Sequence, residues 1–165
     1  MRNRLIWTAL TLLAVGVFAW FVYRWVAAGS FNVCVPEKLT EEATKTIEGL
    51  DKIIDLGITL STSLVGLGAA ILIGLKSGFR VSLPNQLIVL VAILFFVQSA
   101  IYAIWWRLGV AEIRLNQCFK VIAEDFLQRK FEAHFFLFIL GLSALGVLVA
   151  GAVIAGPTAK AEDNT

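Results

Sequence analysis

Four long apolar stretches constrain the fold of this chain more than any other feature. They cover residues 5–26, 53–75, 87–106 and 135–155. Each is close to the roughly 20 residues that an α-helix needs to cross a bilayer. Of the 165 residues, 59% are hydrophobic and only 16% are charged, which is outside the usual balance of water-soluble domains. The sequence therefore predicts an all-α, polytopic membrane protein with four transmembrane helices.

The first stretch resembles a secretory signal peptide in its flanks but not in its length. Arg2 and Arg4 precede it, and residues 26–28 (Val-Ala-Ala) imitate a cleavage site. The apolar run of residues 5–26 is longer than the roughly 7 to 15 residues of a signal peptide's apolar region. We therefore expect it to be kept as the first transmembrane helix.

Aromatic residues mark one end of the first and third spans. Trp and Tyr favour the membrane–water interface. They gather toward the C-terminal ends of both spans, at Trp20, Tyr23, Trp25, Tyr102, Trp105 and Trp106. We expect these two ends to lie at the same interface, as a four-span topology requires.

The polar residues 40–52 predict an extension of the second helix beyond the bilayer. Thr40 is a candidate N-cap, and Glu41 and Glu42 follow it at the positive end of the helix dipole. No helix-breaking residue separates this segment from the span. One continuous helix over about residues 40–75 would be longer than the hydrocarbon is thick, so its first turns would project into water.

Residues 111–134 predict a second extension, which leads into the fourth span. Apolar side chains recur at three- and four-residue steps, at Leu115, Phe119, Ile122 and Phe126. This spacing is typical of an amphipathic helix. With no Gly or Pro after Gly109 until the span itself, we expect the chain to reverse near Gly109 or shortly after it. Helices two and four would then both protrude on one side.

The remaining segments complete a single-domain plan. A tight turn connects spans two and three; it contains Lys76 and Arg80, which could face a soluble partner. Residues 1–156 form one bundle, and residues 157–165 form a polar, disordered tail.

Two signals disagree on orientation. The basic start of the chain favours cytoplasmic N- and C-termini, because the first span usually dominates. However, nine of the 14 Lys and Arg residues fall on the extension side and five on the other. We follow the first span, which places the extensions outside the cytoplasm.

The two cysteines, Cys34 and Cys118, both belong to the extension side. They could form a disulfide there, which an oxidising exterior would preserve. The alternative to the disulfide, with equal weight, is two unpaired thiols that pack as small apolar groups.

Helix two carries a face of small and mildly polar residues: Asp55, Thr59, Thr62, Ser63, Gly66, Ala70 and Gly74. In lipid, such faces let helices approach closely. The alternative is a pore lining in an oligomer, with Asp55 at its mouth.

Other polar residues near the spans have structural interpretations. We expect Gln98, deep in span three, to form a hydrogen bond to a neighbouring helix. We expect His134, at the entry to span four, to be solvated or to cap a helix, with pH sensing as the alternative. The pairs Glu124-Asp125 and Arg129-Lys130 predict a salt-bridged helix face.

Catalysis, metal binding and nucleic-acid binding have little support. A single His and two Cys do not form a four-ligand zinc site without several carboxylates, and no catalytic triad can be assembled. A net charge of +2 on scattered basic residues does not suggest a nucleic-acid surface. We expect no enzyme activity and no cofactor.

Three functional hypotheses remain. The first is a homo-oligomeric sensor or adaptor that couples the external helical head, or a membrane perturbation, to a soluble cytoplasmic partner. The second is an oligomeric ion-conducting pore that depolarises the membrane. The third is an accessory subunit of a larger membrane complex. In size and layout, the chain resembles the small four-span subunits of bacterial phage-defence and envelope-stress systems, which implies a stress or antiviral role in a bacterial inner membrane.

Overall fold

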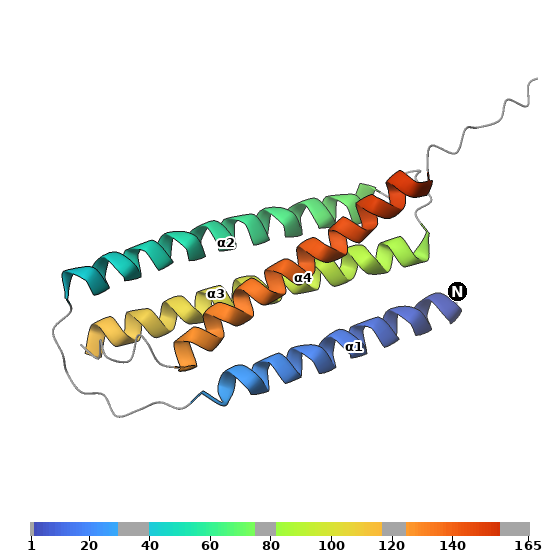
Figure 1. The fold of residues 1–165 in the computed structure, drawn as a ribbon. Coiled ribbons are helices and arrows are strands. Elements are labelled where there is room, and N and C mark those ends of the chain that lie inside the picture. Colours follow the sequence, from blue (N-terminus) through green and yellow to red (C-terminus); the bar gives the residue numbers. More distant parts are fainter. Residues whose placement is uncertain (1, 30–39, 75–81, 117–124, 156–165) are drawn as a thin grey trace, which may run out of the picture.

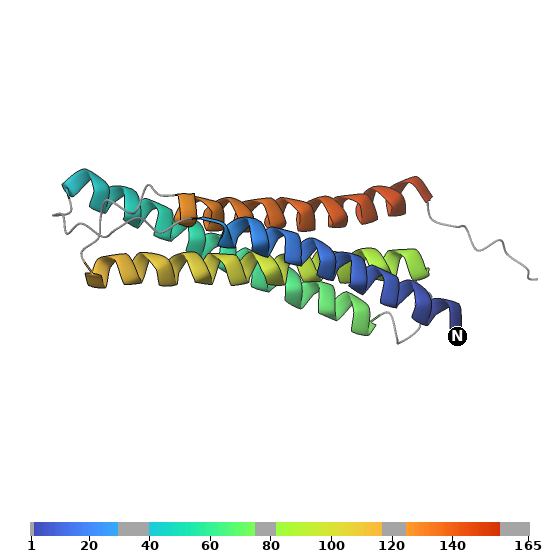
Figure 2. The same ribbon diagram turned by 90° about the horizontal axis from the view of Figure 1, so that it is seen from below.

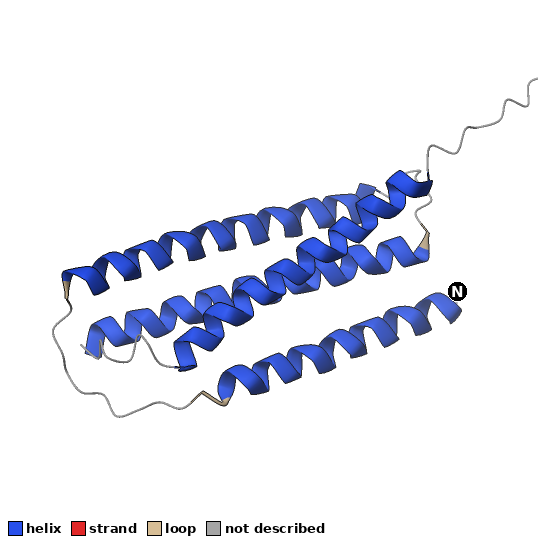
Figure 3. Cartoon of the chain, in the orientation of Figure 1, coloured by secondary structure: helices blue, strands red, loops and turns tan. Residues whose placement is uncertain are grey.

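The computed structural model describes residues 2–29, 40–74, 82–116 and 125–155. These residues form four α-helices: α1 (Arg2–Ala27), α2 (Glu41–Gly74), α3 (Leu83–Asn116) and α4 (Asp125–Ala155) (Figures 1 and 3). All four are long and apolar enough to span a membrane, by length and composition. The prediction of an all-helical chain with four potential spans is confirmed at this level, and it indicates a membrane protein.

The helices form an up-and-down bundle in which neighbours in the sequence run in opposite directions (Figures 1 and 2). Helices α1 and α3 end where α2 and α4 begin. Tyr23 of α1 stacks on Trp105 of α3, with ring centroids 6.1 Å apart. The prediction that the aromatic ends of the first and third spans lie at one level is therefore confirmed.

Helix α3 is the centre of the bundle. It packs against α4 and α2 along most of its length, whereas α1 touches only α3 and α4, and over a narrow strip. Most buried residues of α3 follow a seven-residue repeat, at Val89, Ala92, Phe96, Ser99, Ala103, Trp106, Val110 and Ile113. Alternating three- and four-residue steps keep one seam facing its neighbours, as in coiled coils.

Helix α2 is continuous from Glu41 to Gly74, as its sequence predicts. It begins directly after Thr40, and its first backbone bond runs from the Thr44 N–H to the Thr40 carbonyl at 3.0 Å. Glu41 and Glu42 occupy the first turn, where the helix dipole favours negative charge.

The reversal predicted near Gly109 or shortly after it comes too early, and the predicted helix over residues 111–134 is wrong. Helix α3 continues through Gly109 to Asn116, so residues 111–134 are not one helix running into span four. Gly109 serves a close contact instead: a Cβ there would lie 2.9 Å from Cδ2 of Leu127 on α4. The glycine marks where two helices approach each other and not where one of them stops.

Candidate functional site

Three buried polar side chains, one from each of three helices, meet inside the bundle. Ser61 of α2, Ser99 of α3 and His134 of α4 are all at most 1% exposed. The hydroxyl oxygens of the two serines are 3.5 Å apart, and Ser99 Oγ is 2.8 Å from His134 Nδ1. Buried polar groups are stable in an apolar interior only when they are hydrogen-bonded to one another or to backbone.

The hydrogen bonds between Ser99 and His134 are consistent with one protonation state. Ser99 Oγ donates to the His134 backbone carbonyl at 3.0 Å, so its oxygen is left as an acceptor. His134 Nδ1 lies 3.0 Å from the Ser99 carbonyl and 2.8 Å from Ser99 Oγ, both acceptors. A proton on Nδ1 satisfies all these contacts at once. The imidazole thereby ties α4 to α3 at two points.

The other edge of the imidazole faces α2 at Gly57. A Cβ at Gly57 would overlap the His134 ring around Nε2, so only glycine fits at this position with the ring where it is. The three helices are therefore fixed relative to one another by hydrogen bonds on one side of the ring and by close packing on the other.

One turn before His134, the ammonium of Lys130 lies between aromatic rings. Lys130 is 1% exposed, and its Nζ is 3.4 Å from the ring centroid of Phe126 and 4.6 Å from that of Trp105. A cation over an aromatic face is attracted by the ring quadrupole, most strongly where water is excluded. The buried charge is thus held by α3 and α4 together.

An ion-pair network joins the outer edges of α2 and α3. Arg107 Nη1 lies 2.7 Å from Asp55 Oδ1, and Arg107 Nε lies 3.8 Å from Asp51 Oδ1. Arg114 Nη2 lies 3.4 Å from Asp51 Oδ2. Two carboxylates on successive turns of one helix are thereby matched by two guanidinium groups on the other.

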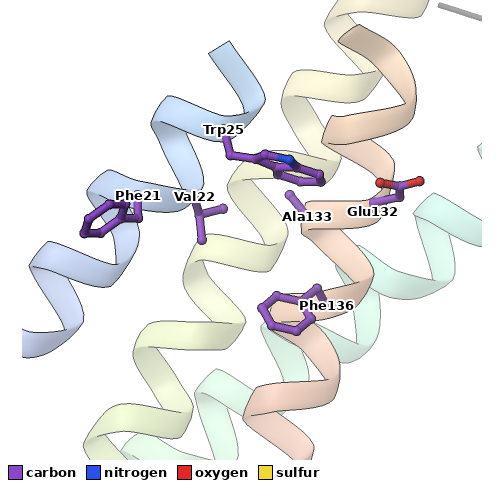
Figure 4. A pocket seen from close by; sticks show the side chains of 6 residues that line it. All are labelled: Phe21, Val22, Trp25, Glu132, Ala133 and Phe136. Carbon is purple, nitrogen blue, oxygen red and sulfur yellow. The ribbon is translucent and has the colours of Figure 1, made fainter. Parts of the chain in front are cut away.

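A mainly apolar groove of about 520 Å³ lies between α1 and α4. Figure 4 shows Trp25 and Glu132 close to each other at one end, Phe136 further along α4, and the ring of Phe21 on the side of α1 away from α4. The lining residues are Phe21, Val22, Trp25, Glu132, Ala133 and Phe136.

The predicted face of α2 lies outside these contacts except at Asp55, which pairs with Arg107 of α3. Its members Asp55, Thr59, Thr62, Ser63, Gly66 and Ala70 are exposed in the single chain, and Gly74 is the last residue of the helix. The hydroxyls of Thr59, Thr62 and Ser63 donate to carbonyls of α2 itself, at 2.8 to 3.0 Å. Apart from the ion pair between Asp55 and Arg107, this face is left exposed by the other described helices, and packing between copies stays a prediction.

Three predictions about polar residues need correction. His134 is buried and hydrogen-bonded between helices, so it is neither solvated nor a cap. Lys130 is buried between aromatic rings, so only Arg129, whose Nη2 lies 3.3 Å from Asp125 Oδ2, belongs to a salt-bridged face. Gln98 Oε1 is buried with no hydrogen-bond partner, and the interhelical bond expected of it is made by Ser99 instead.

Several predicted residues lie outside the part of the chain that the structure describes. These are both cysteines of the candidate disulfide, two members of the amphipathic stripe, one acid of the predicted salt-bridged face, the two basic residues of the turn, and the tail: Cys34, Cys118, Phe119, Ile122, Glu124, Lys76, Arg80 and residues 157–165.

Sequence reasoning missed the inner face of α2, although a signal for it exists. Ile47, Ile54, Ser61 and Gly68 recur at seven-residue steps and are all buried. Their repeat matches that of α3 and could have identified them as its partner face.

Within the described residues, no group of three or more His, Cys, Asp or Glu side chains is placed to hold a metal ion. The chain matches no known family model, no curated protein sequence and no solved structure.

Proposed function

We propose that this protein is a non-enzymatic membrane sensor or adaptor subunit that works as a homo-oligomer. In this proposal it lies in a bacterial inner membrane with both termini in the cytoplasm. A soluble cytoplasmic partner binds the turn with Lys76 and Arg80 or the tail. The observation that carries the proposal is the outer face of α2, which stays exposed while the opposite face of the same helix is packed.

The outer face of α2 suits contact with another copy of the chain. Gly66 has no atom of another part of the chain within 4 Å of an added Cβ, so a neighbouring helix can come close there. Helices in lipid associate through close van der Waals contact between small residues, because lipid tails are as apolar as leucine side chains. The exposed hydroxyls are already bonded to their own helix, so the face tolerates an apolar neighbour.

The polar interior supports a sensing role. Ser61, Ser99 and His134 link three helices through a few directional contacts, and Lys130 lies one turn away. A shift of one helix breaks several of these contacts together, which favours two discrete packings over continuous deformation. The first turns of α2 and α4 and the last turns of α3 form the external head in this proposal.

Cysteine cross-linking in native membranes tests the oligomer. In a chain carrying Cys34→Ser and Cys118→Ser, we expect Gly66→Cys to form a covalent dimer on mild oxidation. Leu67→Cys is the matched control, because Leu67 is the adjacent exposed residue and points about 100° away around the helix. Equal cross-linking at both positions, or none at Gly66, would remove the proposed face.

The pore hypothesis places free Asp55 carboxylates at a channel mouth. In the single chain, Asp55 Oδ1 is 2.7 Å from Arg107 Nη1 and is therefore committed to α3. We expect purified protein to be silent in planar-bilayer recordings. Regular single-channel currents that change with Asp55→Leu would favour the pore over the sensor or adaptor.

The accessory-subunit hypothesis predicts that the chain needs other proteins to assemble. Purification in mild detergent followed by mass measurement separates it from the adaptor. We expect a defined homo-oligomer; a monomer that gains mass only with other membrane proteins would favour the accessory role.

A further inference from the structure

The groove between α1 and α4 opens sideways from the bundle. Helix α1 contacts α3 and α4 but not α2, so one flank of α1 is left uncovered next to α4 (Figure 1). Phe21 and Trp25 are 62% and 45% exposed, and Phe136 on the opposite wall is 52% exposed. Helices α1 and α4 are both long and apolar enough to span a membrane, and in a membrane the groove would open toward lipid.

The walls of the groove are apolar along its length, and its polarity is confined to one end. Phe21 and Phe136 lie one turn further from the helix termini than Trp25 and Glu132, so the groove runs from a polar mouth toward the middle of both spans (Figure 4). Its volume of about 520 Å³ falls within the roughly 300–1,000 Å³ of pockets that hold small ligands. A flexible hydrocarbon chain fits this shape better than a rigid polar ligand.

The mouth carries charges of both signs. Arg129 Nη1 donates to the Trp25 carbonyl at 3.0 Å, its Nη2 lies 3.3 Å from Asp125, and its guanidinium lies over the Trp25 ring. These bonds use two of its five N–H groups. Three residues further on α4, Glu132 Oε1 accepts a hydrogen bond from Gln128 at 2.8 Å, and a carboxylate can accept several more.

We propose that this groove binds a phospholipid with a zwitterionic headgroup that ends in a primary ammonium. One acyl chain lies against Phe21 and Phe136, the phosphate meets Arg129, and the ammonium donates to Glu132. On α4, the mouth combines the guanidinium of Arg129 with the carboxylates of Asp125 and Glu132, so a headgroup with both a phosphate and an ammonium matches it better than one with a phosphate alone. A quaternary ammonium has no N–H to donate to Glu132, so a choline headgroup fits less well.

A bound lipid would complete the attachment of α1 to the bundle. Val26 packs with Tyr102, Ala133 and Leu137, and Arg129 bonds to the Trp25 carbonyl, but the side chain of Phe21 is left 62% exposed. An acyl chain between Val22 and Phe136 would add apolar contact on that flank. This role is independent of whether the chain forms oligomers through α2.

Native mass spectrometry of the full chain in mild detergent tests the proposal. The protein is mixed with equal amounts of phosphatidylethanolamine, phosphatidylcholine and phosphatidylglycerol that carry different, similar-length chains so that their masses differ, and the assay is repeated with the chains exchanged. We expect one phosphatidylethanolamine to be retained about tenfold more than either other lipid, as a charge-assisted hydrogen bond predicts. Equal retention of the three lipids would overturn the headgroup assignment.

Two variants with matched controls locate the site. Glu132→Gln should abolish the preference for the primary ammonium, whereas Glu48→Gln, on the exposed surface of α2, should leave it unchanged. Val22→Trp should fill the groove and lower retention of all three lipids, whereas Leu13→Trp, at a position 65% exposed, should not. Glu132→Gln removes no packing volume, so it tests the site independently of Val22→Trp. An unchanged preference in Glu132→Gln, or unchanged retention in Val22→Trp, refutes the proposal.

Discussion

The two halves of the bundle are held together by different kinds of contact. In the half where α2 and α4 begin, polar side chains such as Ser99, Lys130 and His134 are buried and partnered across helices. In the other half, the helices are joined by close packing of apolar groups. Phe96 is fully buried, and its ring lies 2.7 Å from the position that a Cβ added at Gly141 would take. We call these the polar half and the apolar half.

The difference teaches how such a bundle fixes its register. An apolar interface in lipid has no directional bonds, so only the fit of its side chains opposes a slide by one turn. A buried hydrogen-bonded histidine cannot slide, because its partners would be left unsatisfied in a medium without water. We infer that the polar half defines the alignment of α2, α3 and α4, while the apolar half supplies insertion into the membrane.

The most direct test of these two roles is to add one methyl group in the polar half. Gly57→Ala places a Cβ in the His134 ring, which is hydrogen-bonded on its other edge and cannot retreat. We expect a loss of about 3 kcal/mol in unfolding free energy, at the upper end for overpacking. Equilibrium unfolding in mixed micelles with a rising SDS fraction measures it.

Two glycines serve as controls for that experiment. Gly66→Ala meets no atom within 4 Å and should leave monomer stability unchanged or slightly raised. Gly141→Ala in the apolar half meets only the Phe96 ring, which can turn, and should cost less than Gly57→Ala. If Gly141→Ala proves the more damaging of the two, register is set by the apolar half.

The serine pair offers a smaller effect. Ser99→Ala removes the hydroxyl that donates to the His134 carbonyl at 3.0 Å, but keeps the backbone carbonyl that Nδ1 also faces. We expect a cost of about 1.5 kcal/mol for Ser99→Ala, near the net value of one buried hydrogen bond. Ser61→Ala, whose hydroxyl is 3.5 Å from Ser99 Oγ, should cost about 0.5 kcal/mol or less. The same unfolding assay measures both losses of stability. Equal losses for Ser99→Ala and Ser61→Ala would mean that α2 is held to α3 as firmly as α4 is.

Lys130→Met tests whether the buried charge stabilises the polar half. Methionine keeps most of the side-chain length, and its sulfur also favours the rings of Trp105 and Phe126. The attraction of the ammonium to the rings and the cost of burying it nearly cancel, so we expect a change within about 1 kcal/mol in either direction. A loss well beyond that in the unfolding assay would show that the cation contributes far more than its burial costs.

The sequence predicts the four helices well but the polar half poorly, and the reasons are physical. Span prediction depends on mean hydropathy, to which one histidine or serine contributes little, so Ser99 and His134 do not disturb it. On α2, two faces compete: the stripe around Gly66, and the face of Gly57 and Ser61, both rich in small residues. Only the partner helix decides which face is inside, and hydropathy carries no information about partners.

The Gly109 error has the same origin. A glycine in an otherwise helical pattern reads as a stop when the chain is considered alone, because it lowers helix propensity. Inside the bundle, its missing side chain is what lets Leu127 approach α3. Contacts between helices outweigh a local cost of about 1 kcal/mol.

A coupling of less than about 1 kcal/mol is expected for the ion pair at the edge of the polar half. Arg107 and Asp55 are 41% and 59% exposed at the side chain, and their charged atoms are 2.7 Å apart. In water, such a pair is worth about 0.2–1 kcal/mol, whereas the same charges in a low-dielectric medium interact several times more strongly. A double-mutant cycle of Asp55→Asn and Arg107→Gln in nanodiscs measures the coupling. We expect a value below about 1 kcal/mol, because we place this level of the bundle in or near water. A coupling of several kcal/mol would put Arg107 and Asp55 within the hydrocarbon, and the external head would then have to begin closer to the ends of the helices.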